Sequence, residues 1–483
     1  MTAAPRSLGE LEARVAQDMT WLNLPAKPWL PRLEADGAVV VDVAVIGGGL
    51  CGLVALAALK RVGIHNVLAF DRAPKGREGP WITYARMETL RTRKEAAGPA
   101  LGIATLTFRA WFEAQFGAEA FASMGLIPRS QFMKYLVWYR QILGLPVENE
   151  TRVTAVDIRE DGLLAVSHHG PAGPARTLAR RVVVATGLDG LGGPSLPLLA
   201  QQVPSRYIAH GAAAIDMEAL RGKRVAVVGA GASAMDNAAA ALEAGAARVD
   251  IFIRRPDIPR VDKFTGIGSQ GMVHGYFGLP DDAKWMLMLE GERAQIPPPR
   301  HSVLRVSRHR NAHFHLHSPL LDLAENEGAV AITTPKGRYA ADFIIFCTGF
   351  SVDLDRRPEF SGFAEKIALW RDVYCPPPGM EHEGLSRSPY LGANFEFLPK
   401  AGGTPAVSQI YCFAYPAVTS HGKITSGIPS ISDGAQRLAQ GIARSLMVQD
   451  HVQLLEKFRA YDVPELLGDE WHDADQVTDE LNA

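Results

Sequence analysis

A glycine-rich turn near the N-terminus has the spacing of a dinucleotide-binding site. Gly47, Gly49 and Gly52 form the series G-x-G-x-x-G directly after an apolar, β-branched run. The first glycine permits a tight bend, the second lets the backbone approach a pyrophosphate, and the third lets a helix pack on a strand. Asp71 ends the next apolar run, where its carboxylate can accept hydrogen bonds from ribose hydroxyls. Because such bonds need free hydroxyls, we expect FAD at this turn.

A second turn repeats this spacing but lacks the acid. Gly229 and Gly231 take the first two positions, and Ala234 takes the third. Where a carboxylate would repel a 2′-phosphate, the chain has two arginines, and guanidinium groups suit phosphate oxygens. The alternative is that this arginine pair forms only a solvated basic edge. The favoured prediction is an NADPH site that consists of Gly229, Gly231, Ser233, Arg254 and Arg255.

The elements around both turns are typical of Rossmann units. The run Val41–Ile46 predicts a buried parallel strand, and a helical spacing of apolar residues follows the first turn. After the second turn, a helix and a strand over 249–253 are expected. Two further apolar runs, 181–187 and 342–350, each end in Thr-Gly, where small residues allow the backbone to lie against another surface. One such run follows each turn, which favours a pair of dinucleotide domains.

These patterns predict an α/β fold with two Rossmann-like dinucleotide-binding domains, for FAD and NADPH, the NADPH domain being inserted in the FAD domain. The predicted parts are an N-terminal arm at 1–40, an FAD-binding domain at 41–215 plus 342–463, an NADPH-binding domain at 216–341 with a lid-like insertion at 264–300, and an acidic tail at 464–483.

Composition excludes several classes of protein. The 50 basic and 52 acidic residues give a net charge of −2, so neither nucleic acid nor an anionic membrane is an expected partner. The chain has no signal-peptide pattern and no long apolar run, and we expect a cytoplasmic protein. Its four cysteines lie far apart in the sequence, which argues against a zinc knuckle and against a disulfide reductase.

Between residues 41 and 350 the chain resembles the flavin-containing monooxygenases, part of the class B flavoprotein monooxygenase family. The stretch 84–94 is similar to the family's Leu-x-Thr-Asn-x-Pro segment, and the residues from Tyr135 to Val153 are similar to its connection into the adenine-contacting strand. The stretch 342–350 resembles the family's D-x-x-x-x-A-T-G-Y motif, with Cys347 for Ala and Phe350 for Tyr.

The resemblance implies an NADPH-dependent FAD monooxygenase that takes a small-molecule substrate and O2. In such enzymes a C4a-(hydro)peroxyflavin transfers one oxygen atom to a nucleophile. The candidate FAD-binding residues are Gly47, Gly49, Gly52 and Asp71, and the further candidate cofactor-binding residues are Arg72, Trp81, Val153, Thr186, Gly187 and Gly349.

Two departures from the family pattern qualify this expectation. Of the fingerprint F-x-G-x-x-x-H-x-x-x-W/Y only His210 is present, and Ala214 replaces the aromatic residue. Nitrogen or sulfur acceptors are therefore favoured over Baeyer–Villiger oxygenation of a ketone. Arg93 stands where the family has an active-site Asn. It is either a catalytic cation that steadies an anionic peroxide or a substrate carboxylate, or a surface arginine. The open alternatives are a flavin reductase or oxidase without oxygen transfer and a non-catalytic redox sensor.

Three other stretches carry weaker expectations. We expect the insertion 264–300 to be a substrate lid or a contact in a possible homodimer, or alternatively a short helix with Trp285, Met286 and Met288 in its core. The alternating histidines of 313–317 share one strand face, but no metal is expected there. A helix over 435–448, capped by Ser430 or Ser432, would direct its positive end at the flavin.

Overall fold

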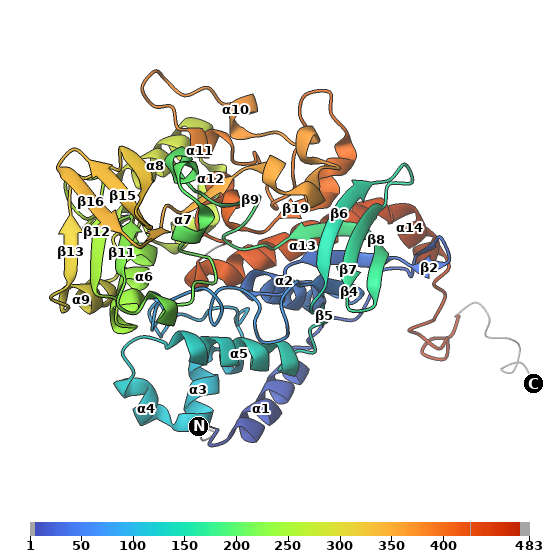
Figure 1. Ribbon diagram of the computed structural model, residues 1–483. Coiled ribbons are helices and arrows are strands. Elements are labelled where there is room, and N and C mark those ends of the chain that lie inside the picture. Colours follow the sequence, from blue (N-terminus) through green and yellow to red (C-terminus); the bar gives the residue numbers. More distant parts are fainter. Residues whose placement is uncertain (1–4, 426, 474–483) are drawn as a thin grey trace, which may run out of the picture.

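The computed structural model describes residues 5–425 and 427–473, and helices surround the two largest of their sheets (Figure 1). The larger sheet has the strand order β5-β4-β3-β8-β7-β6, with β19 on the free side of β8. The strands β5, β4, β3, β8 and β19 are parallel, whereas β7 and β6 extend the sheet in antiparallel fashion. Its strands are β3 (Val41–Ile46), β4 (Val67–Phe70), β5 (Val147–Glu148), β6 (Arg152–Ile158), β7 (Leu164–Gly170), β8 (Gly173–Val184) and β19 (Ile410–Cys412).

The second sheet is wholly parallel, in the order β10-β17-β11-β12-β13. In both sheets the strand before the glycine turn lies between its successor and a strand from much later in the chain. This reversal of strand order opens a crevice at the carboxyl ends of the strands, the usual ligand position in doubly wound sheets. The two predicted Rossmann-like units are confirmed. The strands are β10 (Ile208–His210), β11 (Arg224–Val228), β12 (Arg248–Phe252), β13 (Ala312–His315) and β17 (Phe343–Phe346).

The membership of this second sheet corrects two predicted boundaries. β10 and β17 pair with each other, and β17 also pairs with β11. Boundaries at 215/216 and 341/342 would divide this sheet, because they assign both strands to the FAD domain. Strand pairing between distant parts of the chain leaves no local signal, and the sheet shows that the NADPH-type unit spans about 208–346.

The helices after the two glycine turns formed as expected. α2 (Leu50–Arg61) and α6 (Ala232–Glu243) each begin at the residue after the second glycine of their turn. Both helices are rich in Ala and Leu, which favour helix and allow close packing against the parallel strands. Most side chains of α2 are fully buried in the main core, between its sheet and the C-terminal helix α13 (Ile431–Gln449).

The N-terminal segment contains a helix rather than only an extended arm. α1 (Leu8–Trp21) begins at Ser7, whose hydroxyl accepts from the backbone N–H of Glu10. Leu11 and Val15 are buried in the main core, and α1 contacts α3. These helices lie together below the larger sheet in Figure 1. The others in this layer are α3 (Phe108–Phe116), α4 (Ala118–Ser123) and α5 (Arg129–Ile142).

The insertion 264–300 is largely helical and packs against the rest of the molecule. α7 (Gln270–Gly275) and α8 (Asp281–Ala294) form most of it, and Trp285 and Met288 of α8 are buried, which confirms the short-helix alternative. The indole N–H of Trp285 donates to the carbonyl of Met380 at 2.9 Å. The hydroxyl of Tyr276 donates to the carbonyl of Thr419 at 3.2 Å. The insertion therefore packs against the segment that leads into α13.

α13 begins four residues before the predicted start, and the predicted caps are wrong. Ser430 precedes the helix, but its hydroxyl donates to the carbonyl of Lys423. The hydroxyl of Ser432 donates to the carbonyl of Gly98 and accepts from the N–H of Leu101. Ser430 thus ties the start of α13 to the loop directly before it, and Ser432 ties it to a loop from elsewhere in the chain.

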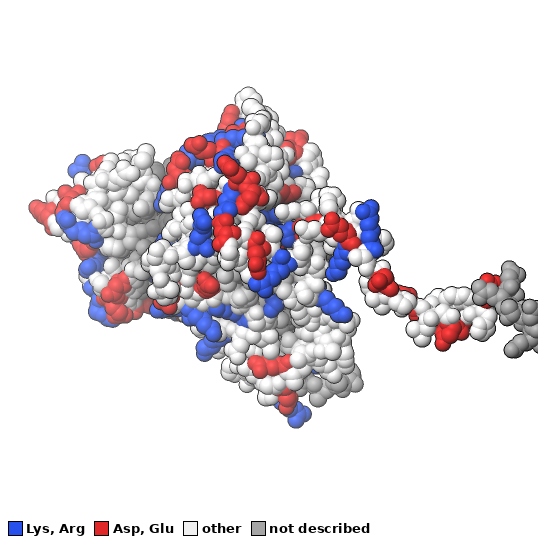
Figure 2. Space-filling model, turned by 90° about the vertical axis from the view of Figure 1, so that its right-hand side faces the viewer, with Lys and Arg blue, Asp and Glu red and all other residues white. Residues whose placement is uncertain are grey.

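The remaining elements cover the edges. After α14 (His451–Arg459), residues 460–473 are all exposed and contain no helix or strand, and Figure 2 shows this acidic segment projecting from the body. No helix among residues 5–425 and 427–473 is long and apolar enough to cross a membrane. The other elements are α9 (Arg300–Ser307), α10 (Trp370–Val373), α11 (Glu383–Ser386), α12 (Val418–His421), β1 (Glu34–Ala35), β2 (Ala38–Val39), β9 (Gly192–Pro194), β14 (Asp322–Asn326), β15 (Ala329–Thr334), β16 (Gly337–Ala341) and β18 (Phe350–Val352).

Candidate active site

The first glycine turn is closed at its ends and open in its middle. Gly47 has φ +110°, and a Cβ there would lie 2.5 Å from the carbonyl oxygen of Ala185 on the neighbouring return strand. A Cβ on Gly52 would lie 1.8 Å from the carbonyl oxygen of Gly47. At Gly49 the nearest atom to a Cβ is 3.8 Å away. The turn is therefore fixed by its outer glycines, and the middle glycine leaves the space that a pyrophosphate needs.

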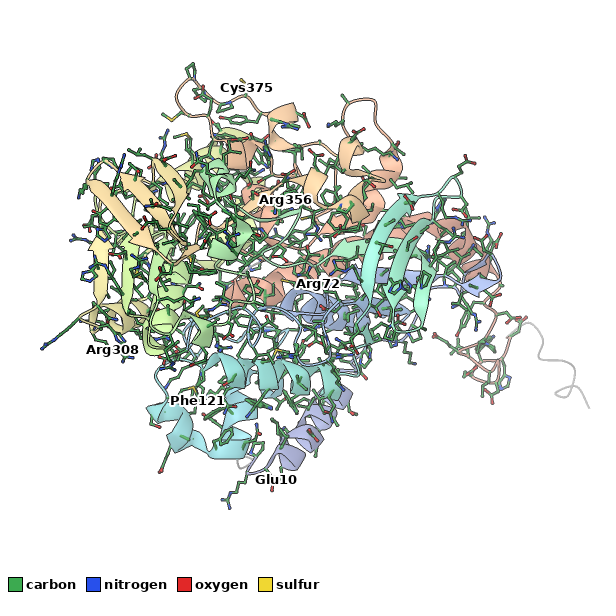
Figure 3. The ribbon with its side chains drawn as sticks, in the orientation of Figure 1. Glu10, Arg72, Phe121, Arg308, Arg356 and Cys375 are labelled. Atoms are coloured by element: carbon green, nitrogen blue, oxygen red, sulfur yellow. The ribbon has the colours of Figure 1, made fainter. Side chains whose placement is uncertain are left out.

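Asp71 holds this turn in shape. Its carboxylate accepts from the N–H of Gly48 at 2.7 Å and from the N–H of Ala73 at 2.8 Å. A carboxylate has about four acceptor positions, so two remain for ribose hydroxyls. Arg72 is more than half exposed and pairs with Asp189 at 3.2 Å, in the central part of the view in Figure 3. The roles of Asp71 and Arg72 at FAD remain proposals.

Trp81 provides a donor without an acceptor. Its Nε1 is buried and has no hydrogen-bond partner in the described part of the chain, and its ring packs edge-on against Phe132. A buried N–H without a partner costs about 1–3 kcal/mol. A ligand that places an acceptor beside this indole would remove that cost. The first turn of α2 also has no side-chain cap at Gly49. Together with the open middle of the turn, these unpaired donors fit a dinucleotide such as FAD.

The remaining candidates of this site come from strands β6, β8 and β17. Val153 is buried in β6. Thr186, directly after β8, donates from its hydroxyl to the carbonyl of Gly190 at 2.8 Å, and Gly187 has φ +65°. Gly349 has φ +82° and accepts from the N–H of Ser195 at 2.9 Å. β9 and β18 pair directly beside these turns. The two predicted Thr-Gly returns are thus joined to each other.

The second glycine turn has the same spacing as the first but looser contacts. Gly229 has φ +139°, and a Cβ there would lie 2.7 Å from the carbonyl oxygen of Cys347, again on the neighbouring return strand. At Gly231 no atom lies within 4 Å of a Cβ, and α6 starts there without a side-chain cap. Ser233 is exposed near the start of α6. The open N-terminus of α6 fits the pyrophosphate of NADPH.

The two arginines after β12 are in different surroundings. Arg255 donates to the carbonyl of Arg293 at 2.8 Å, so part of its guanidinium is used within the protein. Arg254 is exposed, and within residues 5–425 and 427–473 its side chain has no hydrogen bond or ion pair. Ile253, at the position that corresponds to Asp71, is buried. Arg254 is therefore the better placed of the pair for a 2′-phosphate.

The loop 84–94 holds four cations, and three of them stabilise structure. Arg86 donates to the carbonyls of Gly211 and Ala213 at 2.9 and 3.0 Å. Arg91 pairs with Asp262, and Lys94 donates to three carbonyls around residue 122. Arg93 is exposed and has no side-chain partner in the described residues. It is the cation of this loop that is free to meet a ligand, and its catalytic role stays a prediction.

Both histidine features have partners within the protein. Nδ1 of His210 accepts from the N–H of Ala212 at 3.1 Å, and burial lowers the pKa of this ring. His315 pairs with Asp250 at 2.7 Å, whereas His317 lies beyond the end of β13. In the described part of the chain, no group of three metal-ligating side chains occurs.

Lys423 and Phe264 form a contact that none of the sequence motifs predicts. The ammonium of Lys423, in the loop before α13, lies 3.7 Å from the ring centre of Phe264, at the start of the insertion. A signal was present in the sequence, since Lys423 is the only Lys, Arg, Asp or Glu residue in 401–432. A lone charge in an otherwise uncharged, largely buried stretch favours a functional contact.

Comparisons with known proteins identify the relatives of this arrangement. The family model for L-lysine 6-monooxygenase/L-ornithine 5-monooxygenase matches residues 113–295. The FAD-dependent urate hydroxylase of Xanthomonas campestris pv. campestris is 38% identical over 465 residues, which cover 96% of this chain and 98% of the relative.

Two solved structures share the fold. The ornithine N-hydroxylase of Kutzneria sp. 744, with reduced FAD, NADP+ and L-ornithine, has a TM-score of 0.64 at 17% identity and covers 84% of this chain and 99% of its own. The L-lysine 6-monooxygenase of Pseudomonas syringae has a TM-score of 0.64 at 16% identity, with the same coverage of 84% and 99%.

Proposed function

The chain belongs to the class B flavoprotein monooxygenases, and from this premise we propose that it hydroxylates a planar purine anion of the urate type, with NADPH and O2 as co-substrates. Membership makes it an FAD-dependent oxidoreductase that uses NADPH, as the two glycine turns predict. The substrate is the part that we propose.

This proposal is supported by how much of the chain is similar to the urate hydroxylase. The identity with the urate hydroxylase runs over nearly the whole of both chains, so it includes the loop 84–94, the insertion and the start of α13. We propose that these segments surround the place where a substrate would meet the flavin. The likeness to amine hydroxylases, in contrast, is a match to part of the chain or a likeness of fold.

Different residues of the chain would hold the two cofactors and surround the substrate. Gly47, Gly49 and Gly52 with Asp71 would hold FAD, and Gly229, Gly231 and Arg254 would hold NADPH. Reduced FAD, when bound, supplies an electrophilic oxygen atom from O2. The packed aromatic residues of the insertion would keep water from the substrate, and Arg93 would offset negative charge there.

Turnover with a defined set of substrates tests the proposal. FAD-loaded protein is mixed with NADPH, O2 and urate, and the loss of urate is compared with the NADPH consumed. We expect close to one urate lost per NADPH and one atom of 18O from labelled O2 in the product. NADPH oxidation that is unchanged by urate, with no labelled product, would contradict the proposal.

N-hydroxylation of a free amine is the second candidate, because the lysine and ornithine monooxygenase model matches 113–295. L-Lysine, L-ornithine and cadaverine therefore form the comparison set in the same assay. This candidate requires hydroxylamine formation with one of these amines at a kcat/KM above that for urate. The sequence favoured nitrogen or sulfur acceptors, and this comparison tests nitrogen acceptors directly.

Two further expectations remain open to measurement. A homodimer would appear as twice the chain mass in light scattering of the FAD-loaded protein. A cytoplasmic location agrees with the four cysteines, which are all free thiols in this structure, and fractionation of cells would test it.

A further inference from the structure

Lys423 lies where three segments of the candidate active site meet. Its own loop leads into α13, and its ammonium covers the ring of Phe264 from the insertion at 3.7 Å. The charges of Arg91 in the loop 84–94, of Asp262 just before the insertion and of Glu292 in the insertion act on it as well. The side chain therefore bridges the FAD-binding part of the chain and the insertion.

The ammonium lacks an anion of its own. Within residues 5–425 and 427–473 it makes no hydrogen bond and no ion pair, although it is half-buried. The nearby acids have other partners. Asp262 accepts from Arg91 at 3.1 Å and from the N–H of Phe264 at 3.2 Å, and Glu292 accepts from Gln295 at 3.2 Å.

A half-buried cation without an anion is unfavourable in the absence of a ligand. Burial lowers the pKa of Lys423, and the charge of Arg91 lowers it further, whereas Asp262 and Glu292 raise it. An incoming anion would remove this penalty and gain a charge-assisted hydrogen bond. The surroundings of Lys423 thus favour binding of a negative ligand.

Phe264 offers a fixed flat surface beside this cation. A Cβ on Gly291 of α8 would lie 2.4 Å from Cε2 of the Phe264 ring, so the ring sits directly on the glycine. Glycine at this position lets the ring approach the helix, and Asp262 holds the backbone of Phe264. Such a ring can stack with a planar heterocycle.

This pair also lies next to the FAD-binding turn. Thr425, two residues after Lys423, accepts from the thiol of Cys51 at 3.3 Å through its carbonyl. Cys51 is the second residue of α2, whose start faces the predicted pyrophosphate. The loop that carries Lys423 is therefore in contact with the element that would hold the cofactor.

We propose that Lys423 and Phe264 form the subsite that recognises the substrate, Lys423 by the negative charge and Phe264 by the plane of a heterocyclic ring. This inference rests on the proposed function, since urate is a planar monoanion at neutral pH. It makes Lys423 a specificity-determining residue: a neutral purine gains little from it.

The test measures the binding of two purines to the wild type and to four variants. Urate carries a charge at neutral pH, whereas hypoxanthine is neutral. Dissociation constants are measured by the change in flavin absorbance of the oxidised, FAD-loaded protein, and KM and kcat are measured for urate. The variants are Lys423→Met, Lys423→Arg, Phe264→Leu and Lys263→Met, the last being a matched control whose lysine pairs with Glu290.

For Lys423→Met we expect the Kd and KM for urate to rise about tenfold to a hundredfold, with kcat changed less than about threefold. Hypoxanthine binding should change less than about threefold. Lys423→Arg should stay within about fivefold of the wild type, and Lys263→Met should equal it. Phe264→Leu should weaken both purines by about threefold to tenfold, because the ring surface serves both.

Each outcome that differs from these expectations leads to a different conclusion. Equal urate binding by Lys423→Met and the wild type would overturn the subsite and leave the proposed function standing. Equal weakening of urate and hypoxanthine in Lys423→Met would show that the lysine only fastens the insertion, which also overturns the subsite. If the wild type binds urate without hydroxylating it, the proposed function fails and the charge test still decides the subsite. A wild type that does not bind urate contradicts both. Should Lys423→Met lose FAD, Lys423→Gln replaces it.

Discussion

The two glycine turns of this chain have the same spacing but differ in tightness. In the first turn, a Cβ on the third residue would lie 1.8 Å from the carbonyl oxygen of Gly47. In the second turn that third residue is Ala234, whose own Cβ lies 3.4 Å from the place of a Cβ on Gly229. A carboxylate fastens the first turn through Gly48, whereas a buried isoleucine occupies the same place after the second.

This difference matches two kinds of cofactor binding. A tight turn that is held by a carboxylate is ordered before the ligand arrives, so little entropy is lost on binding. The second turn ends in an exposed arginine and an open helix start, which suit a ligand that must enter and leave in each cycle. The comparison therefore predicts a retained flavin and an exchanged nicotinamide nucleotide.

The largest expected effect comes from Gly52→Ala, which adds the methyl group that the first turn cannot hold. Alanine in place of glycine normally favours a helix by about 1 kcal/mol. Here the methyl would overlap a backbone oxygen, and α2 must move away from the turn. We expect FAD affinity to fall by at least about a hundredfold, so that the purified variant is colourless, as measured by flavin absorbance per protein.

Ala234→Gly is the matched control at the second turn. It removes a methyl that the turn accommodates, and should cost about 1 kcal/mol of helix stability while changing the KM for NADPH by less than about threefold. A yellow Gly52→Ala protein with normal FAD affinity would show that the two turns do not differ as described.

The next largest effect is on the pH dependence of stability, and it arises from one buried carboxylate in each of the two large sheets. Burial raises the pKa of Asp42 in β3 from 3.8 to about 6, although Arg180 lies 3.5 Å away and lowers it. The folded protein then binds a proton that the unfolded chain has lost, so stability falls as pH rises from about 4 to about 6. Asp42→Asn removes this loss. Relative to the wild type, its free energy of unfolding should rise by about 2–3 kcal/mol between about pH 4 and pH 7, as measured by urea titrations.

Asp250 in β12 should behave in the opposite way. Burial opposes its ionisation, but hydrogen bonds from His315 and Arg248 hold the pKa of this carboxyl below its ordinary value. The ionised carboxylate of Asp250 stabilises the folded protein above about pH 4, and this stabilisation is lost below that pH. The difference in free energy of unfolding between the wild type and Asp250→Asn should therefore become smaller as the pH falls. Parallel pH profiles for the two variants would contradict the contrast between the sheets.

Local patterns predicted the Rossmann units, because strand, glycine turn and helix follow one another within about thirty residues. Features that depend on distant contacts were missed. β10 and β17 join the second sheet through pairing across more than a hundred residues, so the domain boundaries were misplaced. Ser432 failed as a cap because Gly98 and Leu101 use its hydroxyl. The proposed role of Lys423 depends on its contact with Phe264, which no spacing in the sequence indicates.

The two arginines after β12 should differ in role, because we expect Arg254 to contact the 2′-phosphate and Arg255 to have mainly a structural contact. Arg254→Ala should raise the KM for NADPH about tenfold to a hundredfold and leave the KM for NADH nearly unchanged, because only NADPH has the 2′-phosphate. Arg255→Ala should have less than about a fivefold effect, since its guanidinium donates to the carbonyl of Arg293. Steady-state NADPH and NADH titrations measure both, and equal losses for the two nucleotides would sink the phosphate assignment.

The smallest effect is expected at Asp71, where the change keeps the shape of the side chain and removes its charge. In Asp71→Asn one oxygen can still accept from Gly48, but the amide group would face the N–H of Ala73 as a second donor. Losing one charge-assisted bond costs about 1.4 kcal/mol, so FAD should bind about tenfold more weakly when added to the apoprotein. The KM for NADPH should stay unchanged, because the second turn has no carboxylate at this place. A change in NADPH affinity as large as that in FAD affinity would mean that Asp71 acts on the whole molecule, and the first turn would then owe its tightness to Gly47 and Gly52 alone.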